Sequence, residues 1–94
     1  MINFSKYEEF VSQNTSEPST NFVDLADRIG ELDREGANIE RLLTSGVGIN
    51  AEGREFLEII KKMVFQGKPW NEDNREHLFI VLGDIMWYLA QATL

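Results

Sequence analysis

Three acidic residues, Glu52, Glu55 and Asp84, lie where their carboxylates could act together. On a helix, Glu52 and Glu55 occupy adjacent turns, with Cβ atoms roughly 5–6 Å apart. Glu52 continues the apolar stripe that includes Phe56, so we expect it to point toward the interior. Asp84 lies in the apolar run LFIVLGDIMWYLA (78–90), where an unpartnered carboxylate would lose its charge. A divalent cation would resolve this conflict. Oxygen-only ligands favour Mg²⁺, with Mn²⁺ as the alternative.

The same residues also have interpretations that involve no metal. An ExxE pair on a surface helix is usually solvated charge, and Asp84 could be a protonated or hydrogen-bonded core acid. Glu58 extends the acidic row toward Lys61 and Lys62, and a salt bridge with Lys62 at i+4 is its simplest role. His77, the only histidine, is expected to be a partly exposed helix residue.

Helices are needed to position these residues, and the sequence pattern is helical throughout. Apolar residues recur every three or four residues over 22–32, which predicts an amphipathic helix ending near Gly36. Over 38–66 the pattern predicts either one long helix or two helices joined by a glycine turn. We favour one helix because no proline interrupts the segment. Asn71 is expected to cap a last helix that begins at position 72 and continues to the chain end.

A short helix and a loop are predicted upstream of these segments. Ser5 and Glu8 have the spacing of a capping box, which predicts a helix start near Ser5. The polar stretch NTSEPSTN (14–21) contains one proline and predicts a loop.

Length and charge restrict the classes of protein to which the chain can belong. It has 94 residues, 16 acidic and 9 basic, with a net charge of −7 and 43% hydrophobic residues, typical of a globular protein. We expect a single domain over 1–94 with a thin core that a second copy completes. A pI near 4.6 argues against a nucleic-acid polymer as partner. The lack of cysteine excludes disulfide scaffolds and Cys-ligated metals. With no signal peptide or spanning segment, we expect a cytoplasmic protein that does not bind membranes.

Two segments of the chain resemble the motifs of the MazG-like nucleotide pyrophosphohydrolases, members of the all-α NTP pyrophosphatase superfamily. The first family motif reads roughly G-E-x-x-E-x-x-[DE]-x-x-K-K, and AEGREFLEIIKK (51–62) is similar to it. The second places ExxD inside E-L-G-D-[VI]-[LM]-W-Y, and VLGDIMWYLA (81–90) is similar to it. The connecting stretch VFQGKPWNEDNREHL (64–78) looks like that of phage-type members.

The resemblance implies an all-α helical bundle, completed as a homodimer or tetramer, that hydrolyses NTPs or dNTPs to the monophosphate and pyrophosphate with Mg²⁺. The metal ligands implied by motif position are Glu52, Glu55 and Asp84. Lys62, and secondarily Lys61, would contact the substrate phosphates. Glu58 could orient or deprotonate the attacking water. Trp70, expected in a turn, is the best candidate for stacking on the nucleobase.

The chain departs from the family pattern at two places. Val81 stands where the second motif has its glutamate, which removes one of the usual metal ligands. The chain ends at Leu94 without the further helix that family members usually carry, so we expect a domain truncated at its C-terminus. The alternative function is therefore a catalytically weakened or inactive helical module that dimerises or binds nucleotides.

Overall fold

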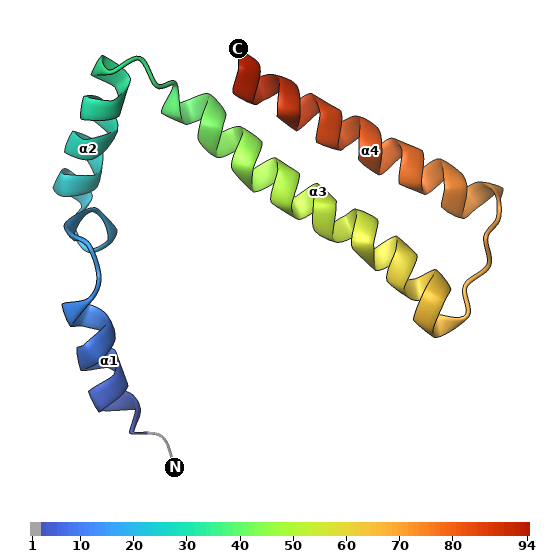
Figure 1. The fold of residues 1–94 in the computed structure, drawn as a ribbon, viewed down its shortest axis with the longest axis horizontal. Coiled ribbons are helices and arrows are strands. Elements are labelled where there is room, and N and C mark those ends of the chain that lie inside the picture. The colour runs from blue at the N-terminus through green and yellow to red at the C-terminus, as the bar shows by residue number, and fades with distance from the viewer. Residues whose placement is uncertain (1–2) are drawn as a thin grey trace. The chain divides into compact units, whose positions relative to one another are not determined.

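The computed structural model describes residues 3–94, and the regular structure within them is entirely helical. The elements, in chain order, are α1 (Phe4–Gln13), the 3-10 helix η1 (Glu17–Ser19), α2 (Phe22–Arg34), α3 (Ile39–Gln66) and α4 (Glu72–Thr93) (Figure 1). This confirms the predicted all-α class. The chain divides into two compact units, Met1–Asn38 and Ile39–Leu94. Every residue of the two motifs lies in the second unit.

Helix α1 of the first unit begins one residue before the predicted cap. Its N-cap is Asn3, whose Oδ1 accepts a hydrogen bond from the backbone N–H of Lys6 at 3.1 Å. The predicted capping box of Ser5 and Glu8 is therefore wrong, because Ser5 already lies inside the helix. Asparagine caps a helix as well as serine does, so the sequence offered two equivalent start points.

Helix α2 has the amphipathic pattern and the limits that were predicted. Asn21 caps it, accepting hydrogen bonds from the backbone N–H groups of Val23 and Asp24 at 2.9 and 3.2 Å. Gly36, with φ of +101°, follows its end. The predicted loop before it contains η1, which packs against α2. No described side chain of this unit is buried, so its described part has no hydrophobic core of its own.

Helices α3 and α4 of the second unit run side by side in opposite directions (Figure 1). Helix α3 is one continuous helix of 28 residues, so the one-helix interpretation is confirmed. Gly67, with φ of +71°, lies just past its end in a conformation that glycine adopts at no cost. Asn71 caps α4 as predicted, because its Oδ1 accepts a hydrogen bond from Asn74 N–H at 2.9 Å.

The buried surface of this hairpin is small. Ser45, Gly48 and Ile59 of α3 are buried, and Val81 is the only buried residue of α4. Val81 has only 2% of its surface exposed, which makes it the most buried apolar side chain among the described residues. This core lies along the seam where α3 meets α4.

Near the open end of the hairpin the helices approach closely. The ring of Tyr88 lies directly against Gly48, so closely that a Cβ on Gly48 would overlap the ring atoms Cδ1, Cε1 and Cγ. Further along, Arg41 Nη1 donates a hydrogen bond to Gln91 Oε1 at 2.8 Å. Position 48 of α3 therefore requires glycine, because the Tyr88 ring of α4 occupies the space that a Cβ would fill.

Both helices of the hairpin also carry large apolar side chains that are exposed. Those of α3 are Leu42, Leu43, Val47, Leu57, Val64 and Phe65. Those of α4 are Phe79, Ile80, Leu82, Met86, Trp87 and Leu89. A helix that is apolar all round is usually buried, either in the core of a large protein or in a membrane. Within residues 3–94, no helix is both long and apolar enough to cross a membrane.

Candidate functional site

Glu52 of α3 and Asp84 of α4 come together across the hairpin. They line one open pocket of about 350 Å³ together with Trp87 and Tyr88. The pKa of Glu52 is raised above its ordinary value by partial desolvation and then by the negative charges of Asp84 and Glu55, with a hydrogen-bonding contribution from Asp84. Ionised Glu52 is therefore in an unfavourable field, which a cation or a proton would relieve.

The two members of this pair differ in exposure. Glu52 is half-buried, as its place on the apolar stripe predicted, whereas Asp84 is exposed. The expectation that Asp84 points into the interior is wrong, because α4 turns Val81, Ile85 and Tyr88 toward the core instead.

Glu55, the third predicted ligand, has a partner that the sequence did not reveal. His77 Nε2 of α4 lies 3.3 Å from Glu55 Oε1, and the two side chains are 49% and 53% exposed, respectively. The contact is an ion pair whenever the imidazole is protonated. The signal that could have found it is the antiparallel pairing of α3 with α4, which brings the start of α4 beside the later turns of α3.

The predicted ligand set is thus only partly assembled. Glu55 is near enough to Glu52 to raise its pKa, but one of its oxygens faces His77. Within the described residues, no three histidine, aspartate or glutamate side chains have an arrangement that could hold a metal ion. A site formed by Glu52, Glu55 and Asp84 would require the Glu55 side chain to turn away from His77.

The basic residues after the first motif are arranged differently from the prediction. Lys61 Nζ, not that of Lys62, donates a hydrogen bond to Glu58 Oε1, at 3.2 Å and a spacing of i+3. The expected salt bridge between Glu58 and Lys62 is therefore replaced by one with Lys61. Lys62 lines a second pocket, of about 420 Å³, which includes Arg54, Glu55 and Glu58.

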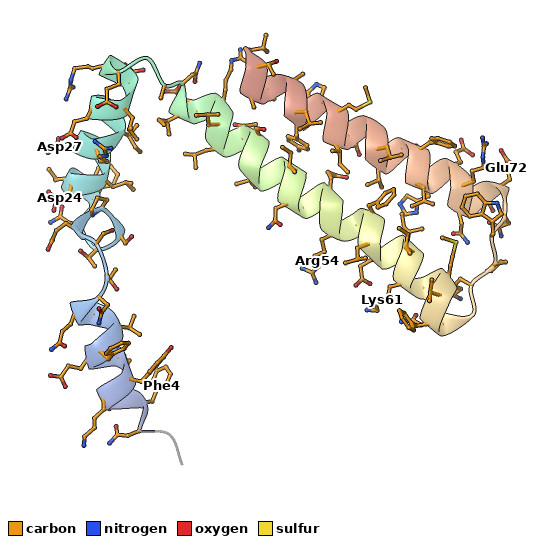
Figure 2. The ribbon with its side chains drawn as sticks, viewed as in Figure 1. Phe4, Asp24, Asp27, Arg54, Lys61 and Glu72 are labelled. Carbon is orange, nitrogen blue, oxygen red and sulfur yellow. The ribbon has the colours of Figure 1, made fainter. Side chains whose placement is uncertain are left out.

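Arg54 is the site residue that the sequence reasoning did not identify. It lies directly before Glu55, and its side chain lines the same pocket as Lys62. Figure 2 shows Arg54 and Lys61 directed from α3 away from α4. The available signal was an arginine inside the first motif, eight residues before Lys62, which is little more than two helical turns.

Trp70 lies apart from the paired carboxylates. It is 66% exposed in the connection between α3 and α4. Asp84 is 12 residues beyond the first residue of α4, which corresponds to roughly 18 Å along the helix axis. Trp70 does not line the pocket of Glu52 and Asp84, whereas Trp87 does, with its ring perpendicular to that of Tyr88.

Val81 is a core residue at the position where the second motif that this segment resembles has a glutamate. It lies one turn before Asp84 on α4, and its side chain is almost fully buried.

Comparisons with known proteins found no match: no family model fits the chain, and no curated protein or solved structure is significantly similar to it.

Proposed function

We propose that the chain is a Mg²⁺-dependent nucleoside triphosphate pyrophosphohydrolase, which releases pyrophosphate and a nucleoside monophosphate from an NTP or dNTP. The observation that carries the proposal is the meeting of Glu52 and Asp84 in one pocket, with the pKa of Glu52 raised in part by Asp84. Two close carboxylates that destabilise each other favour a divalent cation, which removes their repulsion and takes oxygen ligands. The order of the two motifs adds to this support.

The donor atoms are of the type that Mg²⁺ takes, with Mn²⁺ as the alternative. Glu52 and Asp84 offer carboxylate oxygens from two helices, and Glu55 becomes a third donor when it leaves His77. Mg²⁺ often keeps several waters and takes few protein carboxylates, so three are sufficient. A bound divalent cation would neutralise charge on the triphosphate and would make water a better nucleophile.

The remaining residues of α3 bind the substrate and orient the water. Lys62 is the primary phosphate contact, because Lys61 is already hydrogen-bonded to Glu58. Glu58 lies between the acidic motif and the lysines, where its carboxylate orients or deprotonates the attacking water.

We also propose that the protein acts as a homodimer or tetramer, in the cytoplasm, without a nucleic-acid polymer or membrane as partner. The support is the set of exposed apolar side chains on both helices of the hairpin, including Val47 and Met86, which are 69% and 68% exposed. A second copy covering these faces would bury them and enlarge a core that is small in one chain.

Hydrolysis assays test this function directly. Wild-type protein should release pyrophosphate from dNTPs in the presence of Mg²⁺, and Glu55→Gln or Asp84→Asn should abolish the release. Glu76→Gln is the matched control, because it removes the same charge from an exposed position of α4 outside both pockets. Turnover that survives both site substitutions, or that needs no divalent metal, would count decisively against the assignment.

A second candidate function is a MazG-like helical module that dimerises or binds nucleotides without hydrolysing them. Val81 is the observation that favours it, because a buried valine there supplies packing and no metal ligand. Nucleotide binding by calorimetry, combined with no pyrophosphate release at any Mg²⁺ concentration, would support this candidate over the enzyme.

A further inference from the structure

A pocket on the side of α3 combines two cations with two acids. It has a volume of about 420 Å³ and is lined by Ala51, Arg54, Glu55, Glu58 and Lys62. The alanine contributes only a methyl group, so the long side chains around it leave open space. It is separate from the pocket of the paired carboxylates, although Glu55 lies close to Glu52.

Each acid of this pocket contacts a residue that does not line the pocket. Glu55 faces His77 at 3.3 Å, and Glu58 accepts a hydrogen bond from Lys61 at 3.2 Å. Arg54 and Lys62, in contrast, have no ion-pair partner among residues 3–94. The pocket therefore holds two cations whose charge is not neutralised by a salt bridge.

The spacing of these cations suits an anion with more than one charged group. Arg54 and Lys62 are eight residues apart, which corresponds to roughly 12 Å along the helix axis, and both have long, flexible side chains. Arg54 is directed away from α4 (Figure 2), so its guanidinium is open to a ligand. A guanidinium binds phosphate oxygens in a bidentate fork, whereas an ammonium acts as a point charge.

We infer that Arg54 and Lys62 form a binding site for a pyrophosphate-type anion, in which Arg54 grips one phosphate group and Lys62 the next. The inference rests on the proposed function only for the source of this anion, which would be the pyrophosphate that the reaction releases. Glu55 links the two pockets, because it borders the Arg54 pocket and also raises the pKa of Glu52.

Calorimetric titration with sodium pyrophosphate in EDTA tests the site without any metal. Wild-type protein should bind, and Arg54→Ala and Lys62→Ala should each weaken binding about tenfold, the loss expected for one charge-assisted contact. Arg54→Lys should recover part of the loss, because it keeps the charge but not the fork. Arg34→Ala is the matched control, since it removes an exposed arginine of α2 and should change binding less than about twofold.

The outcomes separate this inference from the proposed function. Asp84→Asn should bind metal-free pyrophosphate as the wild type does, even though it should not hydrolyse dNTPs. Pyrophosphate binding that depends on Arg54 in a protein without turnover would overturn the enzyme but keep the anion site. The inference is overturned if wild-type protein does not bind pyrophosphate at millimolar concentration, or if Arg54→Ala binds it as well as Arg34→Ala does.

Discussion

Replacing Gly48 with alanine should destabilise the α3–α4 hairpin, because the added Cβ would overlap the ring of Tyr88. The three nearest atoms are Cδ1, Cε1 and Cγ of the ring, so the whole ring would have to move. Gly48 is buried, and no flexible chain end lies there to bend aside. The substitution therefore tests whether α4 lies against α3 at this point.

Gly46→Ala is the matched control on the same helix, because nothing lies within 4 Å of a Cβ at Gly46. Alanine gains about 1 kcal/mol over glycine in a helix interior, so Gly46→Ala should stabilise the protein by up to that amount. Gly48→Ala gains the same propensity but incurs about 1–3 kcal/mol of overpacking. The propensity gains cancel, and Gly48→Ala should be less stable than Gly46→Ala by about 1–3 kcal/mol.

Thermal unfolding followed by circular dichroism measures this difference, at about 4–8 °C for each kcal/mol in a domain of this size. In a Tyr88→Ala background the ring is absent, and Gly48→Ala should become as favourable as Gly46→Ala. The reasoning is refuted if Gly48→Ala matches Gly46→Ala in the wild-type background, or if removing the ring does not rescue it.

Three further predictions concern charge, burial and association. Glu52→Gln should raise the free energy of unfolding at pH 7, because the raised pKa of Glu52 means that its ionised form destabilises the folded protein. The gain should vanish below the ordinary pKa of 4.5, where Glu52 is protonated in both states, and denaturant unfolding at pH 7 and pH 4 measures both values. Val81→Glu should destabilise the protein by about 3–5 kcal/mol in EDTA, because it places an unpaired carboxylate in the core. Recovery of stability and activity with Mg²⁺ would indicate a restored fourth ligand, whereas no recovery would count against a metal at this position. Met86→Lys, at an exposed apolar position, should shift an oligomer toward monomer in sedimentation equilibrium, and a wild-type protein that is already monomeric would contradict the proposed assembly.

The helices could be predicted where local signals are strong. Asn71 marks the start of α4 because its side chain satisfies a free backbone N–H, and Gly67 marks the end of α3 because of its positive φ. These effects act within a few residues, so they can be recognised from the sequence alone. The start of α1 was predicted to within a residue, but its capping residue was wrong because Asn3 and Ser5 are equally good caps and no local rule distinguishes them.

The candidate site was predictable only in part, because side-chain partners depend on how α3 meets α4. Helical spacing placed Glu52 on the inner face, where it is half-buried. The exposure of Asp84 and the contact between Glu55 and His77 depend on the rotation of α4 about its own axis. The helical periodicity of one segment does not determine that rotation, so it could not be predicted from the sequence.

The packing of Tyr88 on Gly48 fixes the register of the two helices. Gly48 lies four residues before Glu52, and Tyr88 lies four residues after Asp84, so in an antiparallel pair both steps run in the same direction. Sliding α4 by one turn, about 5.4 Å, would lift the ring from the glycine and separate the acids at the same time. Because the contact between Tyr88 and Gly48 lies within the helices, the connection at 67–71 can change in length during evolution without moving the carboxylates apart.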